Sequence, residues 1–156
     1  MKPNLGLTDE QRSGVAALLS KTLADEYVLY TKTRNYHWNV TGPHFNDLHK
    51  FFESQYDLLA ASIDEIAENI RYFGEKAPAT LADFARLTRL PEHPGAYPPA
   101  NEMIANLLAD HETIIRQLRT DIRAAEGHGA ADAADFLTAL LEQHDKMAWM
   151  LRALAE

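Results

Sequence analysis

Four long segments carry apolar residues at helical spacing, and the breaks between them constrain the fold most strongly. Thr8 and Gln11 form a capping box at the start of the first segment, and Asn46 is the expected N-cap of the second. Gly74 and Gly127 are placed to end the second and third segments. The spacing predicts helices over about 8–39, 46–73, 101–126 and 130–156, with a short one, TLADFARL, over 80–87.

The lengths of the connections predict how these helices are arranged. The first and third breaks are short, which favours antiparallel neighbours. The second break spans residues 74–100 and is long enough to run the full length of a bundle. The second and third long helices can therefore run parallel, and one long crossover in a four-helix bundle is the ferritin-like arrangement. An up-down-up-down bundle and a winged helix array are the alternatives.

Composition excludes several classes of protein. A chain of 156 residues suits one domain with one core, and 46% hydrophobic residues is too many for a disordered chain. The absence of cysteine excludes disulfides, thiolate zinc sites and iron–sulfur clusters. No apolar run approaches the ~20 residues that cross a bilayer. We expect an all-α cytoplasmic protein, with one domain over 1–156 that includes a short N-terminal extension of about 1–7, and with no membrane partner.

The second predicted helix carries potential metal ligands away from its apolar stripe. On a helical wheel, Glu53, Asp57, Asp64 and Glu68 lie roughly 130° from the stripe, with His49 near the carboxylates. His49 and Glu53 are four residues apart, as are Asp64 and Glu68, so each pair can reach one ion. Imidazole and carboxylate ligands together suit iron, manganese or zinc. A solvated acidic face is the alternative reading.

One chain cannot bring these two pairs to the same ion, because their centres are about 22 Å apart along the helix. Two copies of the helix that cross antiparallel about a two-fold axis near residue 58 or 59 remove this difficulty. His49 and Glu53 of one copy then face the acidic pair of the other, and His37 can join from the same chain. The Glu-x-x-His motif of di-iron sites inside a bundle has no match around the seven histidines.

These residues resemble the Dps family, the DNA-binding proteins from starved cells or miniferritins. The segment HWNVTGPHFNDLHKFFE, followed by DEIAE at 64–68, carries the likeness, which extends over the whole chain to EQHDKMAWMLR near its end. Many members have Asp where this chain has Glu53. The family's metal ligands correspond here to His37, His49, Glu53, Asp64 and Glu68.

The resemblance implies a hollow homododecamer with iron sites shared between two subunits. It implies that the protein oxidises Fe(II), preferably with hydrogen peroxide, and stores ferric mineral inside the shell. Trp38 is then a nearby electron donor or, equally, a packed interface aromatic. The acids near the last turn correspond to iron-entry pores, although helix-end acids explain two of them nearly as well; they are Asp121, Glu126, Asp132 and Asp135. The five remaining histidines fit no ligand spacing.

DNA binding is the weakest implication of the family name. The first twelve residues contain only Lys2 and Arg12 as basic residues, and no tail follows the last predicted helix. The net charge of −8 also disfavours contact with phosphates. A nucleoid protein that condenses DNA and binds iron incidentally is the alternative function. A helical interaction module with a merely solvated acidic face is a third hypothesis.

Overall fold

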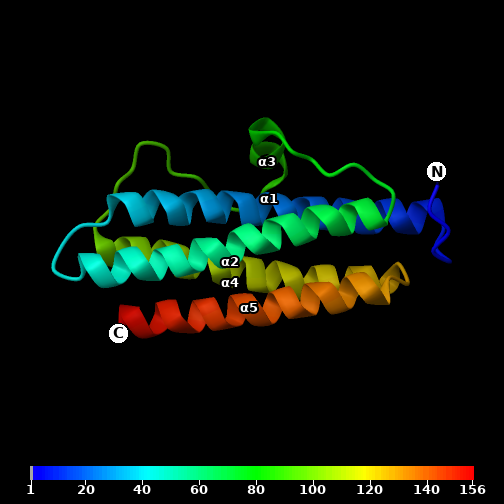
Figure 1. The fold of residues 1–156 in the computed structure, drawn as a ribbon. Coiled ribbons are helices and arrows are strands. Elements are labelled where there is room, and N and C mark those ends of the chain that lie inside the picture. The colour runs from blue at the N-terminus through cyan, green and yellow to red at the C-terminus, as the bar shows by residue number, and fades with distance from the viewer. Residues whose placement is uncertain (1) are drawn as a thin grey trace.

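The computed structural model describes residues 2–156 and contains the predicted four long helices and one short helix (Figure 1). Their bounds are α1 (Asp9–Asn39), α2 (Phe45–Tyr72), α3 (Leu81–Leu87), α4 (Ala100–Gly127) and α5 (Ala131–Ala155). No helix in this part of the chain is long and apolar enough to cross a membrane.

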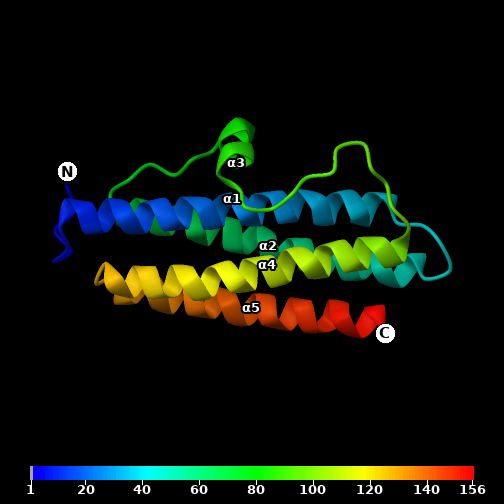
Figure 2. The same ribbon diagram turned by 180° about the vertical axis from the view of Figure 1, so that it is seen from behind.

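The helices form two antiparallel hairpins, α1–α2 and α4–α5, joined by one long crossover (Figures 1 and 2). The crossover runs back along the bundle, so α4 starts at the same end as α2 and the two helices are parallel. Helix α3 lies within the crossover and packs on α1, where Phe84 stacks on Tyr27 with ring centroids 4.3 Å apart. The predicted ferritin-like four-helix bundle is confirmed, and the two alternative arrangements are excluded.

Capping side chains start α1 and α3, whereas α2, α4 and α5 start without one. Both hydrogen bonds of the Thr8–Gln11 capping box are present. The predicted N-cap at Asn46 is wrong, because α2 starts earlier, at Phe45, with His44 as its N-cap. The turn formed by Gly42 explains the difference. Its φ of 113° allows a tight turn whose carbonyl accepts from Phe45 N, and the His44 carbonyl accepts from Leu48 N.

The core is built from the apolar faces of all four long helices. On α2 the side chains that point inward are those of the predicted stripe, and five of them are at most 6% exposed: Leu48, Phe52, Leu59, Ile66 and Ile70. Ile63, the sixth member, is partly buried at the edge. Full burial of such a side chain contributes about 1.5–3 kcal/mol, so this stripe fixes which face of α2 remains outside.

Buried ion pairs attach the crossover to the bundle. Arg89 bridges two carboxylates, with Nε 2.7 Å from Asp25 Oδ2 and Nη1 2.7 Å from Asp121 Oδ2. Asp25 is fully buried, and burial raises the pKa of its carboxyl although the bonds from Arg89 oppose that shift. Lys32 makes a second attachment to Asp110 of α4 and to the carbonyl of Pro91. The crossover is thereby bonded to both hairpins.

Replacing Arg89 with Gln should destabilise the protein by roughly 3–5 kcal/mol, because it leaves two carboxylates buried without their cation. Chemical denaturation measures the change. Arg86→Gln is the matched control, since Arg86 is an exposed residue of α3 whose ion pair with Asp83 lies at the surface. The control should leave stability nearly unchanged. Equal effects of the two substitutions would contradict the anchoring role of Arg89.

Candidate metal centre

His37 and His49 face each other across the α1–α2 turn in a reciprocal arrangement. Their rings stack with centroids 3.8 Å apart and planes at 20°. His37 Nδ1 donates to the His49 carbonyl at 2.7 Å, and His49 Nδ1 donates to the His37 carbonyl at 2.8 Å. Because a carbonyl can only accept, each Nδ1 carries a proton and each neutral ring keeps its Nε2 lone pair. The turn thus holds two imidazoles in the tautomer that binds a metal through Nε2.

Glu53 lies one helical turn after His49, on the exposed face of α2. Tyr56 connects it to the histidines, because its hydroxyl donates to Glu53 Oε1 at 3.3 Å and its ring meets His37 edge-on at 5.2 Å. Desolvation is the largest cause that raises the pKa of the Tyr56 phenol, and the negative charges of Glu53 and Asp57 raise it further. The phenol therefore keeps the proton that it donates to the carboxylate.

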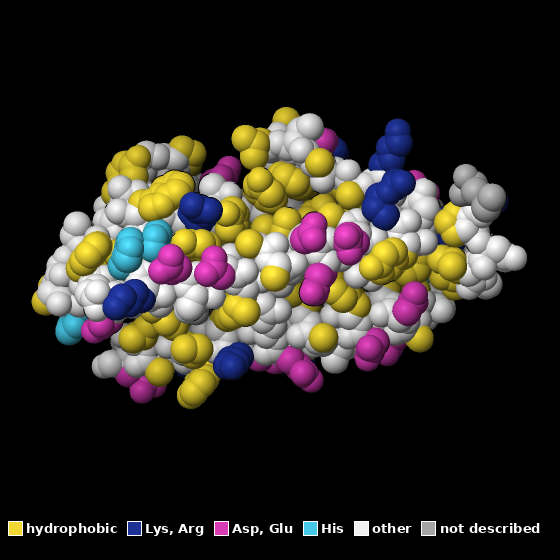
Figure 3. Space-filling model, viewed as in Figure 1, with side chains coloured by type: hydrophobic (Ala, Val, Ile, Leu, Met, Phe, Trp, Pro, Cys, Tyr) yellow, Lys and Arg dark blue, Asp and Glu magenta, His cyan; other side chains and the backbone are white. Residues whose placement is uncertain are grey.

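Asp64 and Glu68 are exposed on the same helix, further towards its C-terminus. Within residues 2–156, no three His, Asp or Glu side chains come together to hold a metal ion. Figure 3 shows histidines with acidic side chains beside them at one end of this face and a separate acidic group further along. The candidate ligands of one chain therefore fall into two separate groups, the His37–His49–Glu53 set and the Asp64–Glu68 pair.

A cationic and aromatic cluster borders the histidines. The Arg34 guanidinium lies 5.0 Å from the Trp38 ring centroid, 4.8 Å from that of Tyr56 and 5.6 Å from that of Tyr30. Its Nη1 also donates to the Tyr30 hydroxyl at 2.6 Å. Trp38 itself is 64% exposed in the single chain. Tyr30, Arg34 and Tyr56 were not among the predicted site residues, although the four-residue spacing of 30, 34 and 38 places Arg34 between the two aromatic side chains of α1.

The four acids predicted to line a pore have different environments. Glu126, Asp132 and Asp135 are exposed around the α4–α5 turn, where they are free to meet solvent. Asp121 is only 5% exposed and is bound to Arg89. Its carboxylate neutralises the partly buried Arg89 within the chain, so it does not contribute to an open acidic surface in this arrangement.

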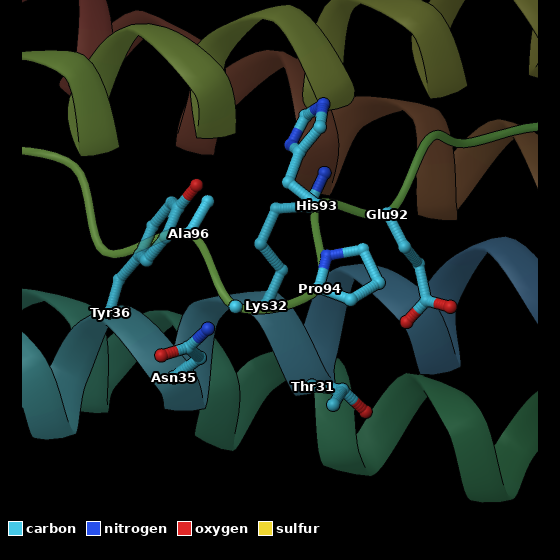
Figure 4. A pocket seen from close by; sticks show the side chains of 9 residues that line it. Thr31, Lys32, Asn35, Tyr36, Glu92, His93, Pro94 and Ala96 are labelled. Carbon is cyan, nitrogen blue, oxygen red and sulfur yellow. The ribbon is translucent and has the colours of Figure 1, made fainter.

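A cavity with a volume of about 180 Å³ lies elsewhere, between α1 and the crossover. Figure 4 shows Glu92, His93 and Pro94 of the crossover lying across from Asn35 and Tyr36 of α1. The amine of Lys32, which also lines it, already binds Asp110 and the Pro91 carbonyl. The cavity contains none of the predicted iron ligands.

Comparison with known proteins defines the family. Residues 16–156 match the family model of the ferritin-like domain. The chain is 47% identical to a low temperature-induced protein of Nostoc sp., over 98% of this chain and 86% of that one. It is 36% identical to DNA protection during starvation protein 2 of Bacillus anthracis, over 89% of this chain and 94% of that one. The structure of Dps from Thermosynechococcus elongatus superimposes with a TM-score of 0.90 at 31% identity, covering 94% of this chain and 93% of that one. The chain belongs to the Dps family of ferritin-like proteins.

The two roles of His49 can be separated by substitution. His49→Asn keeps an N–H donor near the Nδ1 position but removes the Nε2 ligand, whereas His49→Leu removes both. We expect both variants to lose Fe(II) binding. His49→Leu should have an unfolding free energy ~1 kcal/mol or more below that of His49→Asn, because it leaves the His37 carbonyl unpaired.

Anaerobic Fe(II) titration and urea denaturation measure the two quantities on the same samples. Both variants lose the ring stacking, so the comparison isolates the hydrogen bond. Equal stability of the two variants would show that the bond from His49 to the His37 carbonyl does not hold the turn.

Proposed function

We propose that this protein oxidises Fe(II) and stores ferric iron in a hollow cage whose oxidation sites are shared between two subunits. One observation carries the proposal. The candidate ligands of one chain lie in two separate groups along α2 and the end of α1, and both imidazoles donate through Nδ1, which in a neutral ring leaves the lone pair on Nε2. Sites of this kind need a second chain, and membership of the Dps family supports a shell that supplies it.

Two-fold symmetry is the simplest way to complete the ligands. If two α2 helices cross antiparallel near residue 58 or 59, the His37–His49–Glu53 set of one chain meets the Asp64–Glu68 pair of its partner. Ala60 and Ala61 are exposed beside that point, and small side chains allow two helices to approach closely. Leu58 is 48% exposed there and would be buried by the partner. Every such dimer contains two equivalent sites.

The ligands suit iron as the substrate. Imidazole nitrogen and carboxylate oxygen together bind Fe(II), and three carboxylates stabilise the higher charge of Fe(III). Two Fe(II) ions each give up one electron, and hydrogen peroxide accepts both. Its O–O bond breaks, and two protons complete two molecules of water. Oxidation in this way consumes peroxide without releasing a radical.

We assign Trp38 to packing at the subunit contact rather than to electron donation. The fixed positive charge of Arg34 near its ring disfavours loss of an electron from that ring. A ring that is 64% exposed in one chain is instead well placed to be covered by another. For iron entry we propose Glu126, Asp132 and Asp135, whose exposed carboxylates can attract cations to a pore between subunits.

Mixed oligomers test whether the site is shared. His49→Ala and Asp64→Ala should each abolish fast Fe(II) oxidation as homo-oligomers, measured after anaerobic loading and addition of peroxide. Unfolded together and reassembled, the two variants should regain part of the activity, because one of the two sites in each mixed dimer keeps every ligand. A soluble ferric product retained by the reassembled protein would support storage.

His37→Ala mixed with His49→Ala is the matched control, because every site in that mixture lacks one histidine. Activity should not return. If verified mixed dimers of the first pair also stay inactive, the ligands come from a single chain and the shared site is excluded.

We also expect little binding of DNA at neutral pH and moderate salt. The net charge of −8 is multiplied by assembly, and both basic residues near the N-terminus are engaged, since Lys2 pairs with Asp9 and Arg12 binds Asp9 and the Phe73 carbonyl. Little counterion release is then available to favour binding. A gel-shift assay with metal-free protein and a chelator measures it. Tight retardation that weakens steeply with salt would favour the nucleoid hypothesis.

A further inference from the structure

The interior of the bundle contains a polar network that the proposed iron chemistry does not use. Glu26, His111 and His144 are each 0% exposed and come from α1, α4 and α5. His144 Nε2 lies 2.6 Å from Glu26 Oε1, and His144 Nδ1 lies 2.9 Å from His111 Nδ1. Helices α1 and α5 lie at opposite sides of the bundle (Figures 1 and 2), so the network crosses the core and joins the two hairpins.

The cost of burying a net charge, together with the donor and acceptor rules, limits how many protons this network holds. If His144 is an imidazolium, it donates through Nε2 to the Glu26 carboxylate and through Nδ1 to the lone pair of a neutral His111. Both hydrogen bonds are then made, and the three groups together are neutral. Without the proton that makes His144 an imidazolium, the network carries the net negative charge of Glu26 in the dry interior, which is costly. The uncharged state of the network is therefore the one with a single added proton, between Glu26 and His144.

A second proton does not fit. Protonated His111 has N–H groups at both ring nitrogens, so its Nδ1–H would face the Nδ1–H of His144 and their hydrogen bond would break. Burial, and then the charge on His144, lower the pKa of His111 well below its ordinary value of 6.5. His111 Nε2, which carries the ring proton when Nδ1 accepts, has no hydrogen-bond partner within residues 2–156 in either protonation state.

No other ionisable group supplies a compensating charge. The buried face of α2 contributes only the neutral polar side chains Gln55 and Ser62, and that of α3 contributes Phe84. The neighbouring Asp25 and Asp110 are bound to Arg89 and Lys32, respectively, and Asp145, next to His144, faces Arg119 at the surface. The other buried ionisable side chains of residues 2–156 also have partners of their own: Arg12, Tyr36, His37 and Asp121.

We propose that Glu26, His144 and His111 form a one-proton link between the two helical hairpins, which acid breaks by adding a second proton. The link makes the bundle sensitive to mild acid independently of iron. Consider pH values between the ordinary histidine pKa of about 6.5 and the lower pKa of buried His111. In this range both imidazoles of the unfolded chain carry an added proton, whereas the folded network carries only one. Stability therefore falls as pH falls. The network alone raises the unfolding constant about tenfold for each pH unit of acidification.

Two substitutions change this dependence in opposite directions. His111→Asn leaves an oxygen near the Nδ1 position that still accepts from His144, but it cannot be protonated. Folded and unfolded chains then hold one proton each, and the contribution of the network to the acid slope disappears. Glu26→Gln keeps an acceptor for His144 but removes the negative charge, so the folded network holds no extra proton while the unfolded chain holds two. The slope from the network then doubles.

Urea unfolding of the metal-free, assembled protein measures these slopes between pH 6.5 and 5 at one protomer concentration. We compare the unfolding constant of each variant with that of the native protein as the pH is lowered. For each pH unit, this ratio should fall by up to tenfold for His111→Asn and rise by up to tenfold for Glu26→Gln. His93→Asn is the control, because it removes an exposed histidine of the crossover and should run parallel to the native protein. Parallel profiles for all variants would overturn the proposal, since a purely structural role shifts stability equally at every pH. If one variant does not fold, the slope of the other still decides.

Discussion

The rotation of α2 about its own axis determines where every proposed iron ligand of that helix points. Burial of Phe52, Leu59, Ile66 and Ile70 sets that rotation, because turning the helix would expose several side chains worth about 1.5–3 kcal/mol each. The carboxylates of Glu53, Asp64 and Glu68 are then forced onto the outer face. The packing of the core thus places the proposed ligands at the surface, where a partner chain completes them in the proposed dimer.

The α1–α2 turn combines structural and chemical roles in the same two side chains. His37 and His49 each bind the other's carbonyl, so the bonds that close the hairpin also select the ring tautomer. Ligand orientation by a backbone carbonyl is common for metal-binding histidines. Here the arrangement needs no metal to form, and in the proposed dimer the site is preorganised on the histidine side before iron arrives.

The interior of the bundle is used differently from that of ferritin-like di-iron proteins, which place Glu-x-x-His ligands inside. In this chain Glu26, His144 and His111 bind one another in that space, and the buried ion pairs of Arg89 and Lys32 attach the crossover around it. These polar groups connect elements that are far apart in the sequence. They therefore specify how the two hairpins and the crossover dock, whereas the apolar stripes specify only which faces are buried.

The sequence by itself determined the helices and the face that carries the acidic pairs, and the long crossover favoured the parallel placement of α2 and α4. Each follows from a short-range rule: the 3.6-residue period, capping residues, or the length a connection can span. The start of α2 was misplaced because the turn at Gly42, rather than a capping side chain, begins that helix. Only the tertiary structure decided that Asp121 binds Arg89, that Arg34 lies against Tyr56, and that His144 reaches Glu26. These partners lie on different elements of the chain, and their contacts depend on how the packed helices are rotated and aligned, which no local pattern encodes.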